Sequence, residues 1–372
     1  MSVKRTRFSF LEFFAGGGMA RIGLGPHWDC AFANDVDARK CDAYRTNFGG
    51  EELVEASVEA LSLRDLPNER ADLAWASFPC QDLSLAGMRG GIEAKRSGAF
   101  FGFWRLIEAL DDEGRAPHMI VLENVPGLIT SNAGADLDAI AQLMRERGYR
   151  PLAGLIDARA FTPQSRPRLF VVGLGPGVHK APVADGSSSN ESSADAAFQR
   201  AGMTAFPSPR QIRNTRLSDL VEMESHAWDP ASKTQDLVAM MGWHQRARLD
   251  ALLRSGARRV GAGFRRTRII DGKKVQRFEA RFDGLAGCLR TPAGGSSRQI
   301  IIAVEGGAVR TRLMAPREAA RLMGLDDDYL LPDSRSAALK LCGDGVCAPA
   351  VRWLAETILE PALSHRRRAR AA

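Results

Sequence analysis

The residue best suited to nucleophilic chemistry in this sequence is Cys80, which follows the stretch Ala76-Ser77-Phe78-Pro79. The short, mostly apolar run 71–78 predicts a buried strand, and Pro79 ends it. The residues that follow are polar and rich in glycine, as expected of a loop. A thiol at the end of a buried strand, facing a loop, is placed to attack an electrophile as a thiolate. The alternative is a small, buried, apolar cysteine, which is a common role for a single cysteine.

A second group of residues indicates a nucleoside site. Residues 8–14 predict a strand that runs into the turn 15–18, where three glycines precede a helix. Residues 30–37 predict the next strand, which ends near Asp35. A glycine turn followed by an acidic residue after the next strand is typical of nucleoside binding, with the carboxylate on the ribose hydroxyls. A strand–turn–helix without a ligand is the alternative.

The segments that must position these residues alternate between strand and helix. The pattern continues with a helix over 100–110, a strand over 118–125 that carries Glu123 near its end, a helix over 136–148 and a strand over 169–175. This alternation predicts an α/β fold with a doubly wound, mostly parallel, Rossmann-like sheet. Ligands of such sheets bind beyond the carboxyl ends of the strands. Gly16, Asp35, Cys80 and Glu123 are all predicted at that edge.

Basic residues form two further features. Arg166 and Arg168 lie two apart before a predicted strand, so in an extended segment their side chains point the same way. Residues 183–195 are rich in serine and predict a linker. The region 207–307 that follows looks irregular and is dense in arginine and lysine, with interleaved phenylalanines, which suits contact with phosphates and base edges. For both features the alternative is a solvated surface.

Composition narrows the class of protein. A chain of 372 residues with 45% hydrophobic and 26% charged residues predicts a soluble globular protein of about two domains. The basic start of the chain runs directly into a strand and a glycine turn, which is not the pattern of a signal peptide, and no apolar run is long enough to span a bilayer. Six scattered cysteines without a CxxC pair favour neither a zinc site nor a disulfide framework, so we expect a reduced, cytoplasmic protein. The net charge of +7 favours a polyanionic partner.

Taken in order, these motifs resemble those of DNA (cytosine-5)-methyltransferases of the bacterial modification type. The resemblance covers nearly the whole chain apart from the region between the arginine pair Arg166 and Arg168 and the block that begins at Arg317, which in that family is the variable target-recognition domain. The matching blocks are Phe14-Ala15-Gly16-Gly17-Gly18, Asp35, Pro79-Cys80-Gln81, Glu123-Asn124-Val125, Gln164-Ser165-Arg166-Pro167-Arg168, Arg317-Glu318 and Gly343-Asp344-Gly345-Val346.

The resemblance implies a role for each catalytic residue. Cys80 would add to C6 of a flipped cytosine, so that C5 can attack the methyl group of S-adenosyl-L-methionine. Glu123 would hydrogen-bond or protonate cytosine N3. Arg166 would neutralise charge near O2 and orient Glu123, with Arg168 in support.

The resemblance also implies two sets of binding residues. The cofactor set is Phe14, Ala15, Gly16, Gly18, Asp35, Val36, Ser57, Val58, Pro79, Asp344 and Val346. The DNA-contact set is Gln81, Ser84, Gln164, Arg290, Gly294, Gly295 and Arg298. Met19, Ser57, Ala99 and Asp344 depart from the family's usual residues, which affects the cofactor set and leaves the catalytic residues unchanged.

The sequence therefore predicts a DNA (cytosine-5-)-methyltransferase without a metal. Its catalytic domain would comprise residues 1–178 and 308–372, with a linker over 179–206 and a recognition domain over 207–307. We expect a cytoplasmic monomer that associates with the nucleoid through double-stranded DNA and binds no membrane, either beside a separately acting restriction endonuclease or as an orphan enzyme. The alternatives are a tRNA-modifying enzyme of the same motif family, a catalytically inactive DNA-binding regulator and a nicotinamide dehydrogenase.

Overall fold

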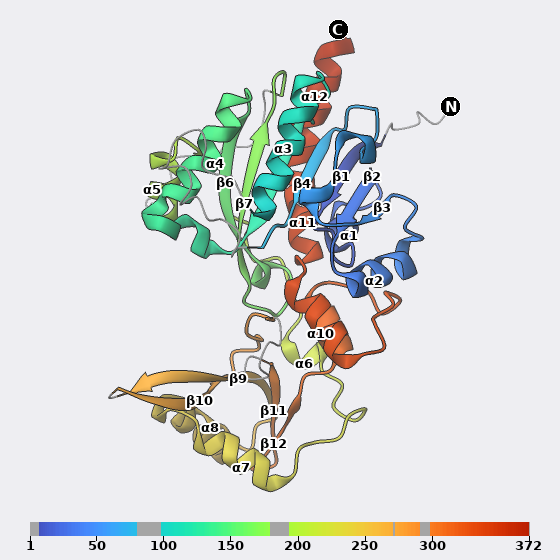
Figure 1. The fold of residues 1–372 in the computed structure, drawn as a ribbon. Helices are drawn as coiled ribbons and strands as arrows, with labels where there is room; N and C mark the ends of the chain where they lie inside the picture. Colours follow the sequence, from blue (N-terminus) through green and yellow to red (C-terminus); the bar gives the residue numbers. More distant parts are fainter. Residues whose placement is uncertain (1–6, 80–97, 179–192, 271, 291–297, 372) are drawn as a thin grey trace. The chain divides into compact units, whose positions relative to one another are not determined.

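The computed structural model in Figure 1 describes residues 7–79, 98–178, 193–270, 272–290 and 298–371. The chain divides into two compact units, each of which we describe by itself. The first unit comprises Met1–Ile156, Pro167–Pro209 and Ala350–Ala372, and the second comprises Asp157–Arg166 and Arg210–Pro349.

The first unit is built on an eight-stranded sheet, with the strands in the order β3-β2-β1-β4-β5-β7-β6-β8. The neighbours from β3 to β5 run parallel, and β7 runs antiparallel to β5. The strands are β1 (Phe8–Phe13), β2 (Trp28–Asp35), β3 (Leu53–Glu55), β4 (Leu73–Ala76), β5 (Met119–Asn124), β6 (Arg150–Asp157), β7 (Pro167–Leu174) and β8 (Thr204–Ala205). The predicted α/β class with a mostly parallel sheet is therefore confirmed.

Helices complete the first unit. Residues of α3, α4 and α5, including Phe100, Leu137 and Phe198, share one hydrophobic core with the central strands. The C-terminal helical segment consists of α11, a π-helical turn over Ala355–Leu359, and α12. The helices are α1 (Met19–Leu24), α2 (Ala38–Phe48), α3 (Ala99–Asp112), α4 (Ala135–Glu146), α5 (Ser193–Arg200), α11 (Ala348–Leu354) and α12 (Glu360–Ala371). None of the helices in the described parts of the chain is long and apolar enough to cross a membrane.

The second unit contains an antiparallel sheet in the order β10-β9-β11-β12. Its strands are β9 (Arg259–Ile270), β10 (Lys273–Arg281), β11 (Ile300–Glu305) and β12 (Ala308–Leu313). Its helices are α6 (Leu217–Leu220), α7 (Ala231–Ala239), α8 (Trp243–Ser255), α9 (Pro316–Leu322) and α10 (Arg335–Asp344). Leu237, Leu249 and Phe278 form a core between α7, α8 and the sheet. The region that looked irregular in sequence is thus a regular antiparallel sheet covered by helices.

The boundaries of the units differ from the predicted ones. Residues 308–349 belong to the second unit, because β12 pairs with β11 along its whole length. Residues 193–206, predicted as linker, belong to the first unit, because Phe198 packs in its core and β8 pairs with β6. Residues 179–192 lie outside the described part of the chain.

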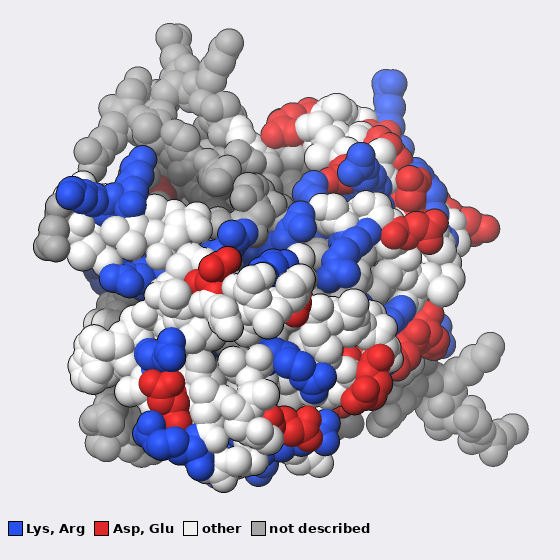
Figure 2. Space-filling model, turned by 90° about the horizontal axis from the view of Figure 1, so that it is seen from below, with Lys and Arg blue, Asp and Glu red and all other residues white. Residues whose placement is uncertain are grey.

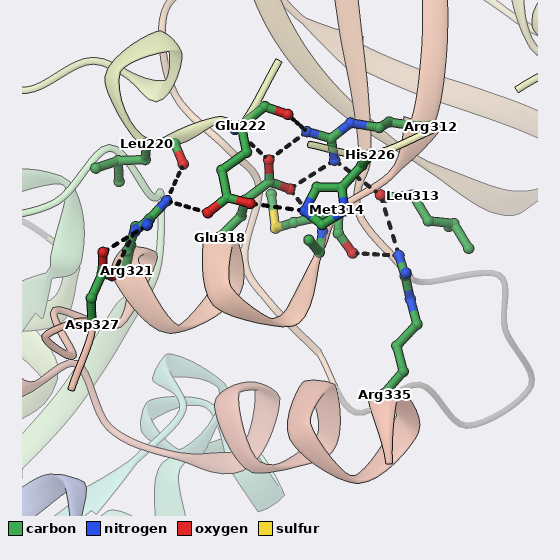
Figure 3. A network of polar contacts seen from close by, with 11 residues as sticks. Leu220, Glu222, His226, Arg312, Leu313, Met314, Glu318, Arg321, Asp327 and Arg335 are labelled. Atoms are coloured by element: carbon green, nitrogen blue, oxygen red, sulfur yellow. Dashed lines mark hydrogen bonds and ion pairs between the residues drawn. The ribbon is translucent and has the colours of Figure 1, made fainter. Parts of the chain in front are cut away.

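A buried polar network joins β12, α9 and the segment before α7 in the second unit (Figure 3). Arg312 and Glu318 form an ion pair in which the side chains are 2% and 1% exposed. The backbone amides of Ala315 and Glu222 also donate to the Glu318 carboxylate, at 2.7 and 2.9 Å. Burial opposes ionisation of Glu318, yet the hydrogen bonds from Arg312 and the two amides hold its pKa below the ordinary value. Arg321 extends the network to the Glu222 carboxylate at 3.0 Å.

We expect Glu318→Gln to destabilise the second unit by about 3 kcal/mol, because it leaves the Arg312 guanidinium buried without a counter-charge. The unfolding free energy can be measured with urea and tryptophan fluorescence, since Arg312 lies 5.2 Å from the ring of Trp228. Glu305→Gln is the matched control, because the Glu305 side chain is 46% exposed and its ion pair with Arg310 lies on the surface. That control should lose less than about 1 kcal/mol. Equal losses in the two variants would contradict the role of the buried pair.

Candidate functional site

The register of the parallel strands brings four strand ends to one level of the sheet. Phe13 of β1 pairs with Asn34 of β2 and with Ala76 of β4, and Ala76 pairs with Leu122 of β5. The residues that follow these pairs therefore lie along the same edge of the sheet. As the sequence predicts, the glycine turn, Asp35 and Glu123 all belong to this edge.

The glycine turn is fixed to the end of β2. Phe14 begins it with a positive φ of 59°, which is uncommon for a residue other than glycine. The Ala15 amide donates to the Asn34 carbonyl at 2.8 Å, and the Gly16 amide donates to Asp35 Oδ2 at 2.8 Å. Gly18 has a φ of 74°, and a Cβ there would lie 2.3 Å from the ring of Phe48. Only glycine fits at that position, because α2 packs directly on the turn.

The groups around the turn suit a nucleoside. Each Asp35 oxygen accepts one backbone amide, from Gly16 or Asp37, and a carboxylate oxygen has room for a second donor such as a ribose hydroxyl. Val36, directly after it, has a side chain that is 68% exposed and presents an apolar surface to a ring. Two residues past β3, Ser57 donates its hydroxyl to Glu59, and the next residue, Val58, is buried.

Two of the departures from the family's residues are buried in the first unit. Met19 begins α1 and is 2% exposed, and Ala99 begins α3 and is 8% exposed. Met19 directly follows the glycine turn, and because its side chain is buried we expect it to act on the site through packing. Asp344 and Val346 belong to the second unit, where Asp344 ends α10 at the surface and Val346 is buried.

A buried carboxyl group, Glu12, lies in β1 just before the glycine turn. Its side chain is 1% exposed, and its Oε2 has no hydrogen-bond partner among the described residues. Burial raises the pKa of Glu12 to about 8, although the charge and backbone amide of Arg21 oppose this shift. Arg21 itself donates to Tyr44 at 2.8 Å and pairs with Glu52. The sequence signal for this group is a charged residue within a mostly apolar strand.

The candidate catalytic edge of the first unit contains Glu123 at the end of β5. Arg168 Nε lies 3.1 Å from Glu123 Oε1, and the two side chains are 14% and 9% exposed. The neighbouring Asn124 donates from Nδ2 to the Phe78 carbonyl at 3.0 Å and accepts from the Val125 amide at 2.8 Å. Asn124 thus holds the end of the segment that leads to Cys80 against the end of β5. Asn124 belongs to one of the motifs in the sequence, but the sequence alone implied no role for it.

The two arginines of the predicted pair, Arg166 and Arg168, contact different groups. The ion pair with Glu123 is made by Arg168, whereas the sequence analysis assigned that orienting role mainly to Arg166. Arg166 is 1% exposed in the second unit, where its guanidinium donates to the carbonyls of Leu289, Gly343 and Gly345 at 2.6–2.8 Å. It therefore ties its own segment to two others of the second unit, at Leu289 and at Gly343 to Gly345.

One predicted DNA contact is not accessible. Gln164 is fully buried, and its amide donates to the Leu322 carbonyl at 2.9 Å and accepts from the Leu289 amide at 3.1 Å. Because the nitrogen and the oxygen of its side-chain amide both form hydrogen bonds inside the second unit, Gln164 is not placed to contact DNA. Arg290 is exposed and Arg298 is half-buried. Five of the predicted site residues lie outside the described part of the chain, because their positions fall within 80–97 and 291–297. They are Cys80, Gln81, Ser84, Gly294 and Gly295.

We expect Glu12→Gln to remove a pH dependence from the stability of the protein. Because the pKa of Glu12 rises from 4.5 to about 8 on folding, the folded state is favoured when the group is protonated. Its contribution is complete below pH 4.5 and is lost as pH rises to about 8, with a slope of up to about 1.4 kcal/mol per pH unit. Urea unfolding between pH 5 and 9 should show this slope in the wild type and a shallower one in the variant. Parallel curves for the two proteins would refute the assignment.

Comparison with known proteins identifies the family. The model of the C-5 cytosine-specific DNA methylase family matches residues 8–360. The chain is 28% identical to the type II methyltransferase M.HpaII of Haemophilus parainfluenzae, over 96% of this chain and 90% of that protein. It is 27% identical to the type II methyltransferase M.HhaI of Haemophilus parahaemolyticus, over 95% and 94% of the two chains.

Solved structures agree on the fold. The Dnmt2 methyltransferase of S. pombe superimposes with a TM-score of 0.61 at 18% identity, covering 95% of this chain and 99% of that one. The methyltransferase EhMeth of Entamoeba histolytica gives a TM-score of 0.62 at 16% identity, covering 96% and 99%. With the glycine turn, Asp35 and the Glu123–Arg168 pair at one edge of the sheet, this chain belongs to the C-5 cytosine-specific DNA methylase family.

Proposed function

We propose that this DNA cytosine-5 methyltransferase transfers the methyl group of S-adenosyl-L-methionine to a flipped cytosine through a covalent bond between Cys80 and C6. The observation that carries the proposal is the pairing of two contacts at the end of β5. Arg168 holds the Glu123 carboxylate, and Asn124 holds the Phe78 carbonyl, two residues before Cys80. The Glu123 carboxyl group and the Phe78 end of the segment that leads to Cys80 are thereby held by neighbouring residues of one strand end.

Cys80 and Glu123 would act at different atoms of the cytosine ring. The Cys80 thiolate adds to C6, which shifts electron density through the ring to N3. Glu123 hydrogen-bonds to or protonates N3 and so stabilises that density. C5 becomes nucleophilic and takes the methyl group. A base then removes the C5 proton, and the electrons of that C–H bond restore the C5–C6 double bond as the thiolate leaves. Arg168 keeps the Glu123 carboxyl in position throughout, since their ion pair is largely shielded from solvent.

The cofactor would be held at the glycine turn of the first unit. Bound there, S-adenosyl-L-methionine supplies a methyl group on a sulfonium, which is the electrophile. Asp35 would accept hydrogen bonds from the ribose hydroxyls, and the exposed Val36 would offer apolar surface to the adenine. Val58 stays in the proposed set as the residue directly after Ser57. Ser57 is in the family's place for the contact with the adenine amino group. The turn itself is formed by Phe14, Ala15, Gly16 and Gly18. The proposed set of cofactor residues also includes Pro79, Asp344 and Val346.

The substrate would be double-stranded DNA, from which the cytosine must be rotated out because its C6 and C5 are not reachable within the stack. The proposed DNA contacts remain Gln81, Ser84, Arg290, Gly294, Gly295 and Arg298. The relatives named above are type II methyltransferases. A restriction–modification system is therefore one setting for this enzyme, and an orphan modification enzyme is the other.

We expect Cys80→Ser to reduce methyl transfer below detection and leave DNA binding within a few-fold of the wild type, because a serine hydroxyl is far less ionised than a thiol at neutral pH. The measurement is incorporation of labelled methyl groups into duplex DNA, together with a binding assay. Wild-type protein should also form a denaturant-resistant complex with DNA containing 5-fluorocytosine, whereas the variant should form none. Full methylation by Cys80→Ser would exclude the covalent mechanism.

The same incorporation assay separates the enzyme from its closest alternative. Labelled cofactor is incubated with wild-type protein and either duplex DNA or tRNA in parallel. Transfer to DNA supports the proposal, and transfer to tRNA alone would overturn the substrate assignment. Bisulfite sequencing of DNA from cells that express the enzyme would then identify the target sequence.

We expect Arg168→Gln to lower kcat by a factor on the order of 100, because general acid–base groups contribute about 10²–10⁴ and Glu123 loses the cation that holds it. Binding of the cofactor, measured by calorimetry, should change little. Arg200→Gln is the control within the same unit, since the Arg200 side chain is 48% exposed and pairs with Asp138 at the surface. An unchanged kcat in Arg168→Gln would show that the ion pair is only structural.

A further inference from the structure

The hairpin of β9 and β10 extends beyond the sheet of the second unit. β9 pairs with β11 only over Arg259 to Gly263, whereas it pairs with β10 over Ala262 to Ile270. The farther part of the hairpin, residues 264–270 with 273–279, is therefore a two-stranded ribbon. Figure 1 shows β9 and β10 as the longest strands of this unit, running away from β11 and β12.

The pairing register assigns each ribbon residue to a face. Residues directly opposite each other in an antiparallel pair share a face, and faces alternate along each strand. Phe278 is fully buried against α7 and α8, so the face that carries Phe278, Arg265, Thr267 and Gln276 is the inner one. The opposite, outer face carries Arg266, Arg268, Lys273 and Arg277, with Val275, Ile270, Phe264 and Glu279.

The outer face carries an excess of positive charge. Its one described carboxylate, Glu279, accepts a hydrogen bond from Arg268 Nε at 2.7 Å and lies 3.9 Å from Arg266. Arg266 and Arg277 are directly opposite each other across the strands. Like charges at opposite positions destabilise a strand pair. Figure 2 shows Lys and Arg side chains projecting at the left of the face of the molecule that it displays.

We propose that the outer face of this ribbon binds the phosphate backbone of duplex DNA and supplies affinity that does not depend on base sequence. A bound phosphate relieves the repulsion between Arg266 and Arg277. The pairing of these two arginines lowers the stability of the free protein, and the same pairing therefore favours the binding of a polyanion. The side-chain amide and hydroxyl of the ribbon, Gln276 and Thr267, are on the inner face, which leaves charge as the main recognition element outside. The inference rests on the proposed function, because it takes duplex DNA as the substrate.

The test removes the cross-strand pair with Arg266→Gln/Arg277→Gln. Arg248→Gln/Arg254→Gln, at two exposed positions of α8, is the control with the same change in net charge. Because the ribbon variant removes a repulsion, it should be at least as stable as the wild type, which thermal unfolding checks. Binding to a short random-sequence duplex is measured as a function of salt concentration.

We expect the slope of log Kd against log salt to fall by about 2 in the ribbon variant, because each phosphate contact contributes about 0.9. The control should keep the wild-type slope, and bisulfite sequencing should show methylation in the same sequence context for all three proteins. An unchanged slope in the ribbon variant, or an equal loss in the control, would overturn the proposal. A change in sequence context would show that the ribbon reads bases instead. If wild-type protein methylates no DNA, the proposed function fails independently of the ribbon.

Discussion

The candidate catalytic edge depends on the reversal of chain direction between β5 and β7. The parallel strands β1, β4 and β5 deliver their carboxyl ends to one edge, and β7 starts at that edge because it runs antiparallel to β5. Arg168, the second residue of β7, therefore lies beside Glu123, the second-last residue of β5. In a parallel neighbour the first residues would lie at the opposite edge. One antiparallel strand thus provides a buried carboxylate with its cation.

Much of this edge could be predicted from the sequence because it rests on local patterns. Short apolar runs marked β1, β4 and β5, and a glycine turn with an acidic residue after the next strand marked Gly16 and Asp35. The targets of Arg166 and Arg168 could not be predicted in this way. Alternation of side chains holds only within one extended strand, and β7 begins at Pro167, between the two arginines. Arg166 therefore lies outside the regular strand, and its guanidinium is directed to backbone carbonyls of its own unit.

The unit boundaries were less predictable because they depend on pairing between distant segments. Residues 308–349 have no change in composition that separates them from the catalytic motifs, yet β12 pairs with β11 and its Arg312 is neutralised by Glu318. Residues 193–206 follow a serine-rich stretch that resembles a linker, yet Phe198 fills the core of the first unit. Low complexity describes how a segment is composed. It carries no information about which sheet the next apolar side chain will reach.

The second unit shows how one strand can serve two physical purposes. A ribbon of two strands is at best marginally stable in water, so its base must be held by a larger sheet. In β9 the residues Val260 to Gly263 are buried. Two glycines in this part leave room for aromatic rings: a Cβ on Gly261 would lie 2.6 Å from the ring of Phe282, and a Cβ on Gly263 would lie 2.8 Å from the ring of Phe278. On β9, the exposed arginines of the ribbon begin at Arg266, three residues after this buried part. The small residues and aromatic rings at the base therefore provide the stability that lets the outer half carry like charges close together.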